Sequence, residues 1–94
     1  MAGYVDGFVL PMPKKNVANY MKLAKRVGKI WIDHGALDYR ECVGDDMVPF
    51  CGPGFPKQLK LKKNETVVFA YVRYKSRAHR DKVNALVMND KRMA

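Results

Sequence analysis

The stretch from Val67 to Tyr74, VVFAYVRY, decides how the fold of this chain is interpreted. β-Branched and aromatic residues fill nearly all of it, which is typical of a β-strand. The side chains at every second position are small and suit packing against helices: Val68, Ala70 and Val72. The side chains between them are assigned to an open side: Val67, Phe69, Tyr71 and Arg73. We extend this strand to residues 65–74 and expect a sheet with one covered face.

The flanking segments alternate between strand and helix patterns. Strands are predicted at residues 3–10 and 36–43, and helices at residues 14–33 and 77–89. Pro11 and Pro13 predict the end of the first strand, because proline is tolerated in a first helical turn. Gly35 follows the first helix as a stop, and Ser76 caps the second. Residues 44–64 are predicted to be a loop with a helical turn in FPKQLKL.

The order of these elements predicts the fold. Strand, helix, strand, strand, helix is the order of a ferredoxin-like split βαβ domain, an α+β fold. The fourth strand of that fold is missing, because residues 90–94 are too short and polar to form it. We therefore expect a single domain over residues 1–94 that is incomplete at its C-terminus.

The uncovered face of the sheet predicts a partner. We assign the larger residues of the first two strands to it: Tyr4, Asp6, Phe8, Leu10, Leu37, Tyr39, Glu41 and Val43. An apolar surface of this size does not stay in contact with water. A second copy of the sheet, packed face to face about a twofold axis, would cover it. The sequence therefore predicts a homodimer.

The same central strand carries a possible nucleic-acid motif. From Phe69 onward it matches the second part of the RNA-recognition octamer, K/R-G-F/Y-G/A-F-V-x-F/Y, so Phe69 and Tyr71 would stack on bases. The octamer's first two positions are both valine here, and Asp6 and Glu41 on the same face would repel phosphate. We expect any RNA binding to be weak and electrostatic, and an RNA-binding module remains the alternative interpretation.

The composition restricts the compartment and the partners that we expect for this protein. The 94 residues carry a formal net charge of +9, which attracts anionic partners but does not identify one. No apolar run is long enough to span a bilayer, and the N-terminus has no signal-peptide pattern. Cys42 and Cys51 lack the spacing of a disulfide framework or a zinc site. We expect a cytoplasmic protein with reduced thiols, no metal, no cofactor and no membrane partner.

Three ordered segments also resemble a known family. They are YVDGFV at residues 4–9, GALDYRECVGDD at 35–46 and VVFAYVRYKSRAHRDKVNALVMND at 67–90. These resemble the YbaA-like family of uncharacterised bacterial proteins, which share a domain of unknown function. The resemblance implies a ferredoxin-like domain of the dimeric α/β-barrel superfamily, with a further segment that carries the fourth strand. That superfamily includes oxygenases, but of its haem-degrading pattern only His79 fits here.

Three side chains are candidates for acid–base chemistry. His79 lies at the N-terminus of the second helix, where the helix dipole favours a neutral ring. Asp6 and Glu41 are carboxylates within apolar strands, where burial without a partner would shift a pKa. For His79 the alternative is a ring satisfied by nearby backbone, and for the carboxylates it is a salt bridge across the dimer to Arg40, Arg73 or Arg80.

The predicted function combines these residues in one pocket. Asp6, Glu41 and His79 are the candidate catalytic residues. The candidate ligand-binding residues are Tyr4, Phe69, Tyr71 and Arg73. We expect a dimeric α/β-barrel protein that binds a small anionic or aromatic molecule, with oxygenase-like turnover as an open question.

Overall fold

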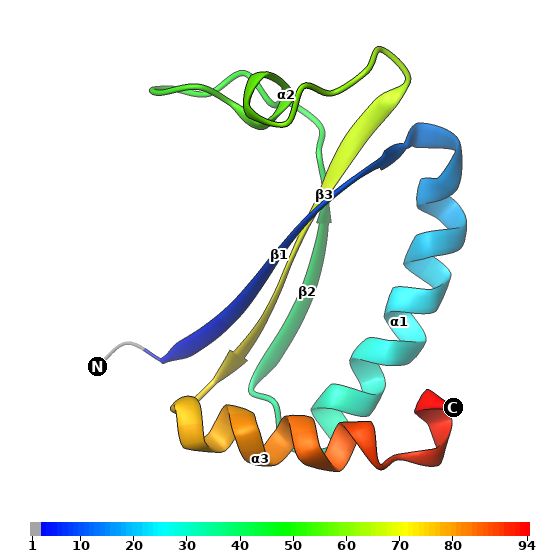
Figure 1. The fold of residues 1–94 in the computed structure, drawn as a ribbon, viewed down its shortest axis with the longest axis vertical. Helices are drawn as coiled ribbons and strands as arrows, with labels where there is room; N and C mark the ends of the chain where they lie inside the picture. Colours follow the sequence, from blue (N-terminus) through cyan, green and yellow to red (C-terminus); the bar gives the residue numbers. More distant parts are fainter. Residues whose placement is uncertain (1–2) are drawn as a thin grey trace.

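The computed structural model describes residues 3–94 and contains the predicted order of elements (Figure 1). These are β1 (Tyr4–Pro13), η1 (Lys14–Asn16), α1 (Val17–Asp33), β2 (Asp38–Val43), α2 (Phe55–Gln58), β3 (Glu65–Tyr74), α3 (Arg77–Met88) and η2 (Lys91–Met93). The α+β class is therefore confirmed, and α2 is the helical turn expected within the long loop.

The three strands form one antiparallel sheet in the order β1-β3-β2. The central strand is β3, with Tyr4 opposite Tyr74 on one side and Asp38 opposite Arg73 on the other. This arrangement is consistent with a ferredoxin-like βαβ plan. It also explains why β3 was the clearest strand in the sequence: its residues are buried at six of ten positions.

The predicted end of the first strand was wrong. β1 continues through both prolines to Pro13, and Pro11 pairs opposite Val67. β1 pairs only with β3, and edge strands tolerate proline when its nitrogen points away from the partner strand. The amide of Lys14 donates to the carbonyl of Asn64 at 2.8 Å. The nitrogens of Pro13 and Pro11 point the opposite way, so they cost no hydrogen bond within the sheet.

The register corrects which side of the sheet each residue faces. Side chains directly opposite each other in an antiparallel pair lie on one face, and both Phe8 and Glu41 are opposite Ala70. The face that packs against the helices, here called the helix face, therefore carries Tyr4, Asp6, Phe8, Leu10, Tyr39, Glu41, Val43, Val68, Ala70, Val72 and Tyr74. The other side, here called the open face, carries Val5, Gly7, Val9, Asp38, Arg40, Cys42, Val67, Phe69, Tyr71 and Arg73.

The assignment of β3 was thus correct and those of β1 and β2 were inverted. Small residues on β3 leave space above the middle of the sheet. The large side chains of the neighbouring strands, such as Phe8 and Tyr39, point into that space instead of away from it. Leu37, which was also assigned to the open side, precedes β2 and donates its amide to the carbonyl of Arg73.

The core lies where both helices meet one end of the sheet. Its buried residues are Ile30, Ala36, Val72, Tyr74, Val83 and Val87. Figure 1 shows α3 crossing the lower end of the strands while α1 runs beside them. Ser76 caps α3 as expected, since its Oγ accepts from the amide of His79 at 3.1 Å. The upper part of the helix face beside β1 is less covered, and Phe8 is exposed there.

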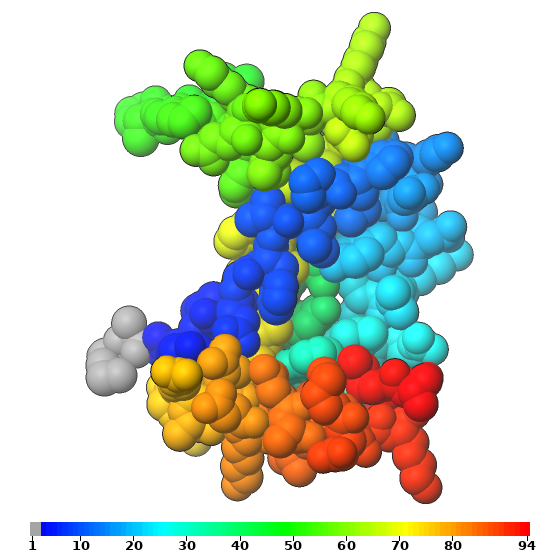
Figure 2. Space-filling model, viewed as in Figure 1, coloured from blue at the N-terminus to red at the C-terminus, as the bar shows by residue number. Residues whose placement is uncertain are grey.

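Residues 44–58, here called the arm, leave the end of β2 and stand out from the body of the molecule (Figure 2). The arm contains α2, which lies against the open face. There Phe55 of α2 stacks on Phe69 of β3 with ring centroids 6.2 Å apart. Val48 and Phe50 of the arm are exposed. The arm therefore covers one end of the open face and leaves the rest uncovered.

Candidate functional site

A cavity of about 180 Å³ lies between α1 and the helix face. Its lining residues are Phe8, Leu10, Tyr20, Val27, Trp31, Tyr39, Glu41, Ala70 and Val72. We call it the aromatic cavity, because four of these residues carry aromatic rings. One carboxylate, that of Glu41, lies among these apolar walls. Such a combination of apolar walls and one polar group is typical of small-molecule sites.

Two tyrosine hydroxyls hold the Glu41 carboxylate from opposite elements. Tyr20 of α1 donates to Oε1 at 2.8 Å, and Tyr39 of β2 donates to Oε2 at 2.7 Å. Burial, followed by the contact with Glu41, raises the pKa of Tyr20 to about 12 and raises the pKa of Tyr39 further. Both hydroxyls therefore keep their protons at neutral pH and act as donors. A carboxylate has about four acceptor positions, so Glu41 can accept further hydrogen bonds from a ligand.

Gly28 of α1 makes room for the Tyr39 ring. A Cβ atom at position 28 would lie 2.6 Å from Cδ1 of Tyr39, closer than real side chains approach. The ring of Trp31 lies on the other side, with its centroid 6.1 Å from that of Tyr39. Gly28 thus fixes where the Tyr39 hydroxyl meets Glu41. The sequence pattern gave no sign of this role, because a glycine within a helix is unremarkable until its neighbour is known.

A second polar cluster connects the cavity to α3. Trp31 Nε1 donates to the Tyr74 hydroxyl at 3.1 Å and to Asn84 Oδ1 at 3.2 Å, and Tyr74 donates to the same amide oxygen at 3.1 Å. Burial raises the pKa of Tyr74 and keeps its hydroxyl protonated. This cluster joins α1, β3 and α3, and it orients the indole that forms one wall of the cavity.

Asp6 is neutralised within the chain. Its Oδ1 accepts from Arg80 Nη1 at 2.6 Å, and the Arg80 guanidinium lies 5.0 Å from the centre of the Tyr4 ring. Arg80 also contacts Asp81 at 2.8 Å. Of the three arginines considered as partners, Arg80 is the one that pairs with Asp6, and it does so inside one chain. Asp6 and Tyr4 therefore both contact Arg80, and this is a structural contact at the start of β1.

His79 is satisfied by nearby backbone. Its Nδ1 accepts from the amide of Lys75 at 2.9 Å, so the proton of the neutral ring lies on Nε2. The ring also meets Tyr74 edge to face at 5.8 Å. These contacts match the alternative stated for His79, a ring satisfied by nearby backbone. His79 does not line the aromatic cavity.

The remaining predicted ligand-binding residues lie on the other side of the sheet. Phe69, Tyr71 and Arg73 belong to the open face, and the rings of Phe69 and Tyr71 are 6.4 Å apart. The sheet therefore separates them from Glu41. The predicted residues form two groups and do not share one pocket.

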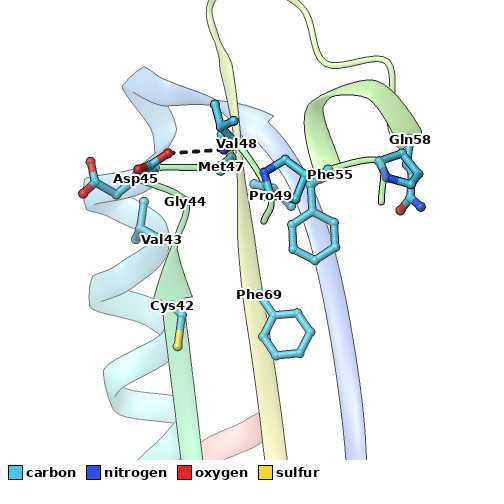
Figure 3. A pocket seen from close by; sticks show the side chains of 14 residues that line it. Cys42, Val43, Gly44, Asp45, Met47, Val48, Pro49, Phe55, Gln58 and Phe69 are labelled. Atoms are coloured by element: carbon cyan, nitrogen blue, oxygen red, sulfur yellow. Dashed lines mark hydrogen bonds between the residues drawn. The ribbon is translucent and has the colours of Figure 1, made fainter. Parts of the chain in front are cut away.

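A second depression lies beneath the arm, at the end of the open face, with a volume of about 470 Å³. We call it the hollow. Figure 3 shows Phe55 of the arm and Phe69 of β3 facing the same space, with Cys42 of β2 beside them. Met47, Val48 and Pro49 of the arm also line it. No role was predicted for residues 44–64 from the sequence, because apolar residues among glycines and prolines show no regular period.

The described part of the chain contains neither a group of side chains that could hold a metal ion nor a helix that could span a membrane. Within residues 3–94, no three histidine, cysteine, aspartate or glutamate side chains are placed to hold a metal ion. Asp46 instead accepts the amide of Val48 at 3.3 Å in a turn. Among the helices of the same residues, none has the length and apolar character needed to cross a membrane.

Comparison with known proteins gives one family. The model of a family described as "Protein of unknown function (DUF1428)" matches residues 3–94. The chain is also similar to uncharacterized protein YbaA of Escherichia coli (strain K12) and of Shigella flexneri. Each is 34% identical over 90 residues, which cover 96% of this chain and 77% of the relative. The resemblance seen in the sequence is therefore confirmed.

Proposed function

We propose that this chain, which belongs to the DUF1428 family of proteins of unknown function, binds a small aromatic molecule in the aromatic cavity. The observation that carries this proposal is the Glu41 carboxylate, held by Tyr20 and Tyr39 and surrounded by aromatic walls. A ligand that offers a hydroxyl or N–H group to Glu41 and a ring to Trp31 would satisfy both parts of the site.

The size of the cavity restricts the ligand to about one ring. Its 180 Å³ lies below the roughly 300–1,000 Å³ of most ligand pockets. An apolar cavity of about 150 Å³ holds benzene, so a single substituted ring fits. The charge of Glu41 disfavours an anionic ligand, since two like charges would meet in a poorly solvated space. Of the two ligand classes expected from the sequence, the geometry supports the aromatic one.

Glu41 is the residue to which we assign proton transfer. A ligand hydroxyl bound to it could pass its proton to the carboxylate, which is general-base chemistry. Removal of that proton is the step with which an oxygenase-like reaction would begin. We assign Asp6 and His79 structural roles, because Asp6 is already bound to Arg80 and His79 to the backbone.

We further propose that the protein is a cytoplasmic homodimer of the α/β-barrel type. The chain exposes 6946 Å², whereas a compact monomer of its mass exposes about 5,500 Å². Its radius of gyration is 15.0 Å, against about 12 Å for a compact chain of this length. The excess area, about 1,400 Å², exceeds the roughly 800 Å² that each partner gives to a standard interface. Two exposed free cysteines suit a reducing compartment.

The fluorescence of Trp31 tests the ligand proposal, because Trp31 lines the cavity and is the only tryptophan of the chain. Titration with phenol should change it, whereas benzoate, an anion of similar size, should bind more weakly. Glu41→Gln should weaken phenol binding about tenfold, as expected for the loss of a hydrogen bond to a charged group. Glu65→Gln is the matched control, because Glu65 lies outside the cavity.

Two outcomes would contradict the proposal. Benzoate that binds as tightly as phenol would show that Glu41 does not select the ligand. Equal phenol affinity in the Glu41→Gln and Glu65→Gln variants would show that binding takes place elsewhere.

RNA binding on the open face is the second candidate, and one observation favours it. Asp6 and Glu41 lie on the helix face, so the repulsion expected from these two residues is absent, and Arg40 and Arg73 flank the rings of Phe69 and Tyr71 instead. Asp38 also lies on the open face, where it pairs with Arg40 at 3.1 Å. Against this candidate, β1 gives apolar residues and no cation to this face, for example Val5, Gly7 and Val9, and Phe69 already stacks on Phe55. We therefore rank RNA below a second copy as the cover of this face.

Binding of single-stranded RNA to the Phe69→Ala variant distinguishes RNA from a second copy as the partner of the open face. Base stacking on Phe69 would contribute about 1–3 kcal/mol, so the variant would lose most of its affinity. We expect weak binding that is lost at moderate salt and is nearly unchanged by the substitution. A tight, salt-resistant complex that Phe69→Ala abolishes in a still-dimeric protein would establish the RNA candidate.

A further inference from the structure

We propose that the arm of one chain exchanges with that of a second copy, so that each Phe50 inserts into the hollow of its partner. This inference rests on the homodimer proposed above and specifies how its ends are held. It concerns the arm and the hollow, neither of which takes part in the aromatic cavity.

Phe50 is an apolar side chain without cover. It is 105% exposed, and Val48 two residues before it is 85% exposed, whereas Phe69 on the sheet is 38% exposed. Together these two side chains form a small exposed apolar patch, which a partner could cover. Phe50 does not reach the hollow of its own chain, since it is absent from the lining although Val48 and Pro49 are present.

The hollow provides the complementary shape. Its volume of about 470 Å³ exceeds the roughly 150 Å³ that accommodates benzene. Its walls include the rings of Phe55 and Phe69, which are nearly parallel at an interplanar angle of 21°. A third ring that entered from outside would add aromatic contacts, which are favourable beyond simple burial. One chain therefore carries both an exposed ring and a site for a ring.

The position of the hollow connects it to the proposed dimer interface. Cys42 and Phe69 line the hollow and also belong to the open face. A twofold axis that runs along the strands would place the arm end of one open face against the arm end of the other. Each arm would then lie over the other chain's hollow, and the two contacts would be identical by symmetry. The contact closes on itself and gives a dimer, not a filament.

Two native cysteines allow a direct test in the unmodified protein. Cys51 is adjacent to Phe50, and Cys42 lines the hollow; both are free and exposed. A short bis-maleimide should link Cys51 of one chain to Cys42 of the other and give a dimer band on a denaturing gel. Cys42→Ser and Cys51→Ser should each lose that band. An equimolar mixture of the two variants, allowed to exchange subunits, should regain it, because one chain then supplies each thiol.

The contribution of the ring is measured by substitution. Phe50→Ser should raise the dissociation constant of the dimer at least tenfold, as for a central aromatic residue in an interface. Leu23→Ser is the matched control, because Leu23 is exposed on α1, away from the arm. Analytical ultracentrifugation gives both constants, and the control should leave its constant unchanged.

The outcomes separate this inference from the dimer itself. A dimer whose cross-link survives in one of the single-cysteine variants, or whose stability is unchanged by Phe50→Ser, overturns arm exchange and leaves the homodimer intact. A wild-type chain that is monomeric at micromolar concentration overturns both.

Discussion

The two faces of the sheet differ in where their side chains find partners. On the helix face each charged or hydroxyl group that the structure describes near the cavity is paired within the chain, as Glu41 is with Tyr20 and Asp6 is with Arg80. On the open face Val5, Val9 and Phe69 remain exposed, and the arm adds Phe50 to them. The difference indicates that one chain completes the polar contacts of the helix face, whereas the open face is the surface that we propose a second copy covers.

Truncation of one valine on each face should give the largest effect. Val72 on the helix face is 3% exposed and Val9 on the open face is 38% exposed. Val72→Ala should lower the free energy of unfolding by about 1.5–3 kcal/mol, because it removes buried methyl groups and leaves a cavity. Val9→Ala should change that of the monomer by less than about 0.5 kcal/mol. Urea denaturation at low protein concentration measures both.

The Val72→Ala and Val9→Ala variants also test whether the open face is covered at higher protein concentration. If the second copy buries Val9, the cost of Val9→Ala should grow with protein concentration, while that of Val72→Ala should not. Equal costs for the two substitutions at low concentration would remove the distinction between the faces.

The sequence predicted the central strand and the order of the elements, because these depend on local patterns. β3 has its predicted limits, since buried residues on both faces give a continuous β-branched and aromatic run. Ser76 was identified as a cap because the cap depends on the next few residues.

The faces of β1 and β2 depend on register, which local patterns did not determine. Both alternating sets of β1 contain apolar residues, for example Phe8 in one and Val9 in the other, so side-chain size was a poor guide. Pairing with β3 fixed the choice. A shift by one residue exchanges the faces, which is why this error affected every assignment in the two strands.

The candidate site was predicted only in part for a related reason. Glu41 was selected as a carboxylate in an apolar strand, but its partner Tyr20 is 21 residues away in the sequence, on α1. Gly28 and Asn84 act through contacts with Tyr39 and Trp31 that exist only in the folded chain. Residue type indicated the chemistry, whereas the geometry required the structure.

Substitution of one glycine on each side of the sheet, Gly28 and Gly7, gives the second comparison of the two faces. In a helix, alanine is preferred to glycine by about 1 kcal/mol. At Gly28, however, the added Cβ would meet the Tyr39 ring at 2.6 Å, so Gly28→Ala should lower the free energy of unfolding by a net ~1 kcal/mol. At Gly7 on the open face a Cβ meets nothing within 4 Å. Gly7→Ala should therefore be neutral or stabilise the monomer by about 0.4–1 kcal/mol.

Thermal and urea unfolding of the two variants should thus move in opposite directions. Stabilisation by Gly28→Ala would show that Tyr39 can move aside and that its contact with Glu41 is not fixed by Gly28. A loss of dimer in Gly7→Ala, with the monomer unaffected, would place the second copy directly over Gly7.

The smallest expected effect is in an alkaline titration of Tyr20, which lies on the helix side of the sheet. The pKa of Tyr20 is about 12 in the folded chain, above its ordinary value of 10.0, through burial first and the contact with Glu41 second. Between these pH values the unfolded chain loses the proton that the folded chain keeps, so the free energy of unfolding should fall as the pH rises from 10.0 to about 12. Glu41→Gln removes the charge but not the burial, so the pKa of Tyr20 should move part of the way toward 10.0. Absorbance of tyrosinate measures this shift, and Glu65→Gln should leave the curve unchanged. A curve that is identical in all three proteins would mean that Tyr20 does not contact Glu41 in solution, and the central feature of the aromatic cavity would be lost.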